Sequence, residues 1–138
     1  MDKALNYLAL AKKGRLIELG EEPVGAITRA VKGRLVIVAA DASDHTWRRA
    51  KSFVAGTDQQ CLRVPFTKEE LGFVVGRTSL AIAAFTDVAM ALAFVKALPD
   101  QEKVKEVREN LDAKSKKLRQ RKDEAKAHER NMRLGKKK

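Results

Sequence analysis

The chain has 138 residues, of which 44% are hydrophobic and 34% charged, and this fits one domain with an appendage better than two domains. Lysine and arginine number 29 against 18 aspartate and glutamate residues, so the formal net charge is +11 and favours a polyanionic partner. The single cysteine excludes an intrachain disulfide, and no apolar run reaches the length of a membrane-spanning helix.

The cysteine and the first residues indicate the compartment. One cysteine favours a reducing environment, and residues 1–15 lack the charged start, apolar centre and small-residue cleavage site of a secretion signal. We therefore expect a cytoplasmic protein that does not bind membranes. Cys61 lies in an apolar stretch, which predicts a small buried side chain rather than a nucleophile.

The first third of the chain predicts two helices and a buried strand. Apolar residues at helical spacing indicate a helix over residues 2–13, which Gly14 ends, and residues 16–19 are compatible with an edge strand. Residues 20–23 (Gly-Glu-Glu-Pro) open a second helix, because acids suit its first turn and proline loses no hydrogen bond there. The β-branched run 35–40 predicts a strand buried on both faces.

Capping residues mark the next helix. Ser43 or Asp44 is placed to cap a third helix that runs to about residue 55. Residues 61–65 then predict a short strand that ends at its proline.

Two further helices flank the second apolar strand. Thr67 and Glu70 have the spacing of a capping box, which predicts a short helix to about residue 75. Residues 80–85 form the second apolar strand pattern. Residues 86–87 (Thr-Asp) then cap a helix that carries its apolar residues along one face.

This order of elements predicts the fold class. Strands that alternate with helices need crossover connections, so we predict an α/β fold: a three-layer α/β/α sandwich with a small mixed sheet over residues 1–99. Residues 100–138 hold 15 basic and 8 acidic residues, which predicts a basic, mixed-charge helical or disordered tail. Its thin apolar stripe suits a solvated helix and consists of Val104, Val107, Leu111 and Leu118.

The tail contains one dense basic cluster. Six cations lie within nine residues and would surround a helix, which suits a groove of phosphates: Lys114, Lys116, Lys117, Arg119, Arg121 and Lys122. Mixed-charge helices also serve as solvated spacers, and of these two interpretations we favour contact with RNA. The cluster lacks the apolar face that binding to a membrane surface needs.

Several short strings are weak signals alone but fairly specific in their order and spacing. They are Leu8–Ala11 with Gly14, Gly20–Glu22, Leu35–Ala39, Asp41–Ser43, Thr46, Glu70–Gly72, Gly76 and Thr86–Asp87. Over roughly residues 3–97 the chain thereby resembles the large-subunit ribosomal protein family L-seven-Ae / L-thirty-e, especially its bacterial YlxQ-like members. The resemblance implies the α/β/α sandwich and binding to structured RNA, often a kink-turn.

The resemblance also implies two RNA-binding surfaces. The first is the start of the second helix, where the family pattern is G-x-N-E-x-x-K, and the second is the loop before the last strand. In this sequence they comprise Gly20, Glu21 and Glu22, and Val75, Gly76, Arg77, Thr78 and Ser79. The sequence departs from the pattern: Gly25 or Ala26 takes the place of the family's lysine, and Glu21 or Glu22 that of its asparagine.

Both surfaces also carry residues whose own chemistry suits a nucleic acid. A helix N-terminus presents free N–H groups to a phosphate. Glu21 and Glu22 either accept hydrogen bonds from guanine or only stabilise the helix dipole. Arg77, Thr78 and Ser79 offer one cation and two hydroxyls to a nucleic-acid backbone, although any short loop contains such residues.

Other side chains give weaker signals. Two outcomes are open for Trp47 on the third helix. It stacks on a base, with Arg48 or Arg49 at a phosphate, or it packs partly buried against the sheet. The second outcome is the commoner one. His45 and His128 lie far apart in sequence, so no metal site with plausible ligand spacing is present.

We therefore predict a non-catalytic, monomeric protein without cofactor or metal that binds rRNA or another structured RNA and associates with the ribosome. Phosphate-loop and nucleophile motifs are missing from the sequence, so an enzyme is not expected. The alternative is a protein-interaction adaptor that keeps the fold, has lost kink-turn recognition and pairs its tail with an acidic partner.

Overall fold

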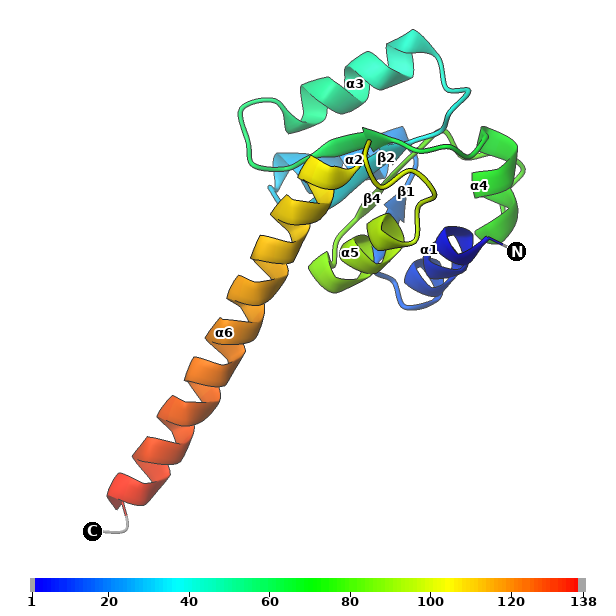
Figure 1. The fold of residues 1–138 in the computed structure, drawn as a ribbon. Coiled ribbons are helices and arrows are strands. Elements are labelled where there is room, and N and C mark those ends of the chain that lie inside the picture. Colours follow the sequence, from blue (N-terminus) through cyan, green and yellow to red (C-terminus); the bar gives the residue numbers. More distant parts are fainter. Residues whose placement is uncertain (1, 137–138) are drawn as a thin grey trace.

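The computed structural model describes the backbone of residues 2–136 and the side chains of residues 2–130. Ten elements follow one another in this part of the chain (Figure 1). The helices are α1 (Lys3–Lys13), α2 (Glu21–Arg29), α3 (Asp44–Val54), α4 (Lys68–Val74), α5 (Val88–Lys96) and α6 (Lys105–Lys136). The strands are β1 (Ile17–Leu19), β2 (Leu35–Val38), β3 (Cys61–Arg63) and β4 (Ile82–Phe85).

The four strands form one mixed sheet in the order β1-β4-β2-β3. β4 pairs antiparallel with β1 and with β2, whereas β2 and β3 are parallel. The register aligns Ile82 with Val38 at one end of the central pair and Phe85 with Leu35 at the other. Every residue of β2 and β4 is buried, as their apolar runs predict, and β1 lies at an edge.

Helices cover both faces of the sheet and make three layers (Figure 1). α2 and α3 pack together on one face, and α1, α4 and α5 pack on the other. The core between β4 and α5 includes Phe85 and Phe94, whose ring centroids are 5.1 Å apart in an edge-to-face arrangement. The predicted α/β/α sandwich with a mixed sheet is confirmed.

Side-chain caps begin four of the helices. Ser43, rather than Asp44, caps α3 and accepts a hydrogen bond from the Thr46 N–H at 3.2 Å. Thr67 and Glu70 form both hydrogen bonds of the predicted capping box at 3.1 Å each. Asp2 and Asp87 cap α1 and α5 in the same way.

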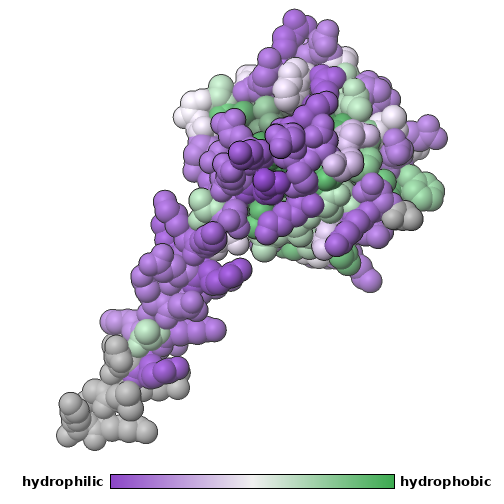
Figure 2. Space-filling model, in the orientation of Figure 1, coloured by the Kyte–Doolittle hydropathy of each residue, from purple (hydrophilic) through white to green (hydrophobic). Residues whose placement is uncertain are grey.

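The tail is helical, the first of the two states predicted for it, and its end at residues 137–138 lies outside the described residues. The beginning of α6 packs against α5: Leu111 is fully buried, and Val104, just before the helix, is 4% exposed. This part of the apolar stripe is therefore not solvated, and only Leu118, at 42% exposure, lies open. The rest of α6 extends away from the domain, and its residues up to 130 are almost wholly hydrophilic in Figure 2.

No helix within the described residues is both long enough and apolar enough to cross a bilayer. The division of the chain at residue 99 stays a prediction. The burial of Leu111 shows that the core includes side chains beyond residue 99.

Leu111→Ala should lower the free energy of unfolding by about 2–5 kcal/mol, because it leaves a cavity between α6 and α5. Urea denaturation of the full chain measures this loss. The matched control is Leu118→Ala, which should change stability by no more than about 0.5 kcal/mol because that side chain is already exposed. Equal effects of the two substitutions would show that α6 is not docked.

Candidate functional site

The two segments for which the family resemblance implies RNA binding meet at the beginning of β4. The Gly20 N–H donates to the Ile82 carbonyl at 3.0 Å, which fixes the start of α2 beside this strand. Arg77 Nη1 lies 3.6 Å from the position that a Cβ on Gly20 would occupy. We call residues 20–22 together with residues 75–79 the α2/loop surface.

The N-terminus of α2 is open. Its N-cap residue, Gly20, has φ +96°, a conformation that favours glycine, and no side chain of the described residues caps the helix. The N–H groups of Glu21 and Glu22 belong to the first turn and have no acceptor within the helix, and Pro23 has no N–H. A nine-residue helix therefore presents its positive end to solvent.

The two acids at this end have different surroundings. Glu21 Oε1 accepts a hydrogen bond from Arg49 Nε of α3 at 2.6 Å, with both side chains about half exposed. The same guanidinium lies 5.0 Å from the centroid of the Phe53 ring. Glu22 is exposed and has no ion-pair partner among the described residues. Glu21 thus holds Arg49 beside the helix end, an interaction that the sequence alone did not indicate.

The loop of the α2/loop surface packs closely against α4. Gly76 has φ +76°, and the Arg77 N–H donates to the Gly72 carbonyl at 2.8 Å. A Cβ on Gly72 would lie 2.8 Å from both the Arg77 carbonyl oxygen and Ser79 Cα. Val75 is only 6% exposed, so its side chain belongs to the core and residues 76–79 form the accessible part.

Gly72→Ala should lower the free energy of unfolding by about 1–3 kcal/mol, since the added methyl group meets backbone that must move. Chemical denaturation gives the size of this effect. Gly14→Ala is the control: its Cβ would make ordinary contacts of 3.4 Å or more at a negative φ, so its cost should stay below about 1 kcal/mol. A neutral Gly72→Ala would contradict the close approach of loop and helix.

Three of the six tail cations lie at the other end of the sheet. The Arg34 N–H donates to the Phe85 carbonyl at 2.7 Å, where β4 ends. Arg34 shares a hollow of about 260 Å³ with Lys114, Lys117 and Arg121. The structure therefore does not bring the tail cluster and the α2/loop surface together.

The six tail cations are not equivalent. Lys114 Nζ donates to the Asp58 carbonyl at 3.0 Å and lies 3.5 Å from its carboxylate, so this side chain fastens α6 to the domain. Lys116 pairs with Asp112 one turn earlier at 3.2 Å. Arg119 faces a separate hollow beside α1 and α5. The cluster surrounds the helix, as its spacing predicts.

Trp47 is half-buried against the core, the commoner of its two expected outcomes. The Arg63 guanidinium lies 5.2 Å and the Lys51 ammonium 5.8 Å from the centroid of its indole ring. The ring therefore already has cationic partners from the same chain.

Phe73, which no sequence pattern singled out, has a side chain that is 75% exposed on α4 beside the loop. Leu5 and Val74 lie with it around an apolar hollow. The only sign of this exposure in the sequence was an aromatic residue outside the apolar face of a short helix.

Cys61 is half-buried, and burial raises the pKa of its thiol above the ordinary value, with Lys51 opposing part of this shift. A raised pKa keeps the sulfur protonated at neutral pH. In the part of the chain that the structure describes, no three ligating side chains gather to hold a metal ion.

Cys61 should react with iodoacetamide more slowly than a free cysteine at pH 8, because less of it is thiolate. Lys51→Ala should slow alkylation further, since losing the nearby positive charge raises the pKa again. Mass spectrometry over time measures both rates. Alkylation faster than that of free cysteine would point to an activated thiol.

No protein-family model and no curated protein matches the sequence. The solved structures that share its fold include the following two. A protein of unknown function from Bacillus halodurans C aligns with a TM-score of 0.66 and 22% identity, covering 72% of this chain and 100% of that chain. A 15.5 kD RNA-binding protein of Giardia lamblia aligns with a TM-score of 0.57 and 17% identity, covering 69% of this chain and 81% of that chain.

These similarities show that the chain shares the fold of both proteins. The Bacillus protein aligns over its whole length and still leaves more than a quarter of this chain unmatched.

Proposed function

We propose that this protein binds structured RNA without catalysing a reaction, and that the α2/loop surface makes the principal contact. The observation that carries the proposal is the meeting of Arg77 with the open N-terminus of α2. A guanidinium beside free N–H groups suits a phosphate, and the Giardia lamblia neighbour is an RNA-binding protein.

Each part of the surface has a role in this proposal. The N–H groups of the first turn of α2 and the Arg77 guanidinium take a phosphate oxygen. Thr78 and Ser79 donate to neighbouring backbone oxygens. Glu22, which is exposed, accepts hydrogen bonds from a base edge, whereas Glu21 is engaged by Arg49.

In the resembled family a lysine supplies a cation at this surface. In this chain the cation comes from a different residue. A Cβ on Gly25 would lie 3.3 Å from the Phe53 ring, so this position has little room for a side chain. Ala26, the other aligned position, is exposed but uncharged. In our proposal Arg77, supported by Arg49, replaces the lysine, and rRNA or a kink-turn-like element is the target.

The tail supplies a second, sequence-independent contact. Residues 119–138 contain nine basic and three acidic residues, and the described part of this segment is exposed. Counterion release from phosphates makes such binding strongly dependent on salt. An RNA that reaches from the α2/loop surface to the tail would extend past the whole sheet.

Arg77→Glu should weaken binding to a kink-turn RNA by roughly 1–3 kcal/mol, because it removes a charge-assisted hydrogen bond and adds a repelling carboxylate. A filter-binding titration at fixed salt measures the affinity. Lys12→Glu makes the same charge change at the far end of α1 and should have a much smaller effect. If both variants bind equally well, the loop is not part of the interface.

A chain that ends at Leu118 should show a shallower dependence of log K on log salt than the full chain, by roughly 0.7–0.9 for each phosphate that the tail neutralises. This truncation keeps Leu111 and so preserves the docked part of α6, whereas deletion from residue 101 would remove a core residue. The melting temperature checks the fold of both chains. An unchanged slope would exclude residues 119–138 from RNA binding.

A further inference from the structure

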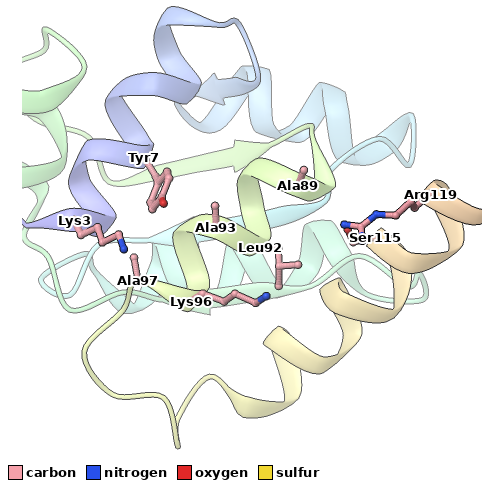
Figure 3. Close-up of a pocket in the computed structure, with 9 residues that line it drawn as sticks. All are labelled: Lys3, Tyr7, Ala89, Leu92, Ala93, Lys96, Ala97, Ser115 and Arg119. Carbon is pink, nitrogen blue, oxygen red and sulfur yellow. The ribbon is translucent and has the colours of Figure 1, made fainter. Parts of the chain in front are cut away.

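A groove lies between α1, α5 and α6 and encloses about 390 Å³ (Figure 3). α5 forms its floor, and α1 and α6 form its walls. Lys3 and Tyr7 come from α1, and Ser115 and Arg119 come from α6. The floor consists of Ala89, Leu92, Ala93 and Ala97, and Lys96 lies at its edge. The groove is separate from the α2/loop surface.

The floor is unusually apolar for an open helix face. Lys96 is the only charged residue of α5, and the sequence before it, Val88–Val95, is wholly apolar. Ala89, Ala93 and Ala97 follow one another at intervals of one turn along the groove; Ala89 is exposed, and Ala93 and Ala97 are half-buried. A helix that faces solvent normally carries polar residues on its outer side, so this face suits a covering partner.

The rim has one sign of charge. Lys3, Lys96 and Arg119 supply three cations, and Tyr7 and Ser115 supply hydroxyl groups. Among the lining residues that the structure describes there is no carboxylate. A partner that fits must therefore be apolar where it meets α5 and negatively charged where it meets the rim.

We propose that this groove binds an acidic amphipathic helix of another protein. The apolar face of such a helix would lie on the alanines of α5, and its carboxylates would pair with the lysines and the arginine. Eight residues of α5 extend about 12 Å, which matches roughly two turns of a partner helix. Small side chains on the floor allow the two helices to approach closely.

Charge and shape make other occupants less suitable. A second copy of this chain carries a net charge of +11, and its free helix end is basic, so the cationic rim repels it. RNA would satisfy the rim but would place phosphates and sugars over an apolar floor. The acidic helix satisfies both parts of the groove.

The test uses the full chain and a fluorescent synthetic peptide of about 20 residues, with leucine and alanine on one helical face and glutamate on the other. Its control is a scrambled peptide of identical composition, which keeps the charge but loses the apolar face. Fluorescence anisotropy at about 0.1 M salt should show the amphipathic peptide binding at least about tenfold more tightly than the scrambled one. Chemical-shift changes should centre on Ala89, Ala93 and Ala97.

Substitutions then locate the site. Lys96→Glu should weaken peptide binding by about tenfold or more, whereas Lys126→Glu, which makes the same charge change on the exposed part of α6, should have little effect. A peptide in which one glutamate is replaced by lysine, tested at each glutamate position in turn, should regain affinity for the Lys96→Glu variant at the position that faces residue 96. This charge swap does not depend on the stability of any core substitution.

Three outcomes would overturn the proposal. The first is equal binding of the amphipathic and scrambled peptides, which would reduce the effect to net charge. The second is equal weakening by Lys96→Glu and Lys126→Glu. The third is a single-stranded RNA that shifts the same floor residues and displaces the peptide, which would make the groove a nucleic-acid contact.

Discussion

The antiparallel pairing of β4 with β1 on one side and β2 on the other positions most of the chemistry of this molecule. The Ile82 carbonyl at the start of β4 holds Gly20, and the loop that enters β4 carries Arg77. Phe85 at its end holds Arg34 beside the tail cations. Because the strand is buried and paired on both sides, neither end can shift without breaking the sheet.

The positive charge is therefore divided between separate places. The α2/loop surface combines one open helix end with guanidinium groups, and this geometry suits a defined phosphate. The tail offers many cations on an exposed helix, which suits general attraction to a polyanion. The groove on α5 differs from both, because its cations surround an apolar floor. The basic residues that give the chain its net charge of +11 thus lie on surfaces of different chemistry.

α6 links two of these surfaces to the core. Leu111 and Lys114 fasten its beginning, through burial against α5 and a hydrogen bond to the Asp58 carbonyl. This docking turns a helix that resembled a solvated spacer into one wall of the groove. A stripe of four apolar residues was too thin to predict burial, because the apolar outer side of α5 supplies the rest of the packing surface.

The order and type of the elements could be predicted from the sequence because their signals are local: β-branched runs, capping residues and the glycine before Glu21 act within a few positions. The contacts that define the candidate site are not local. Arg49 and Glu21 are 28 residues apart, and Lys114 and Asp58 are 56 apart. They meet only because the strands assemble as β1-β4-β2-β3, an order that local patterns do not encode. The same folding turns Val75 into the core and leaves Arg77 at the open end of α2.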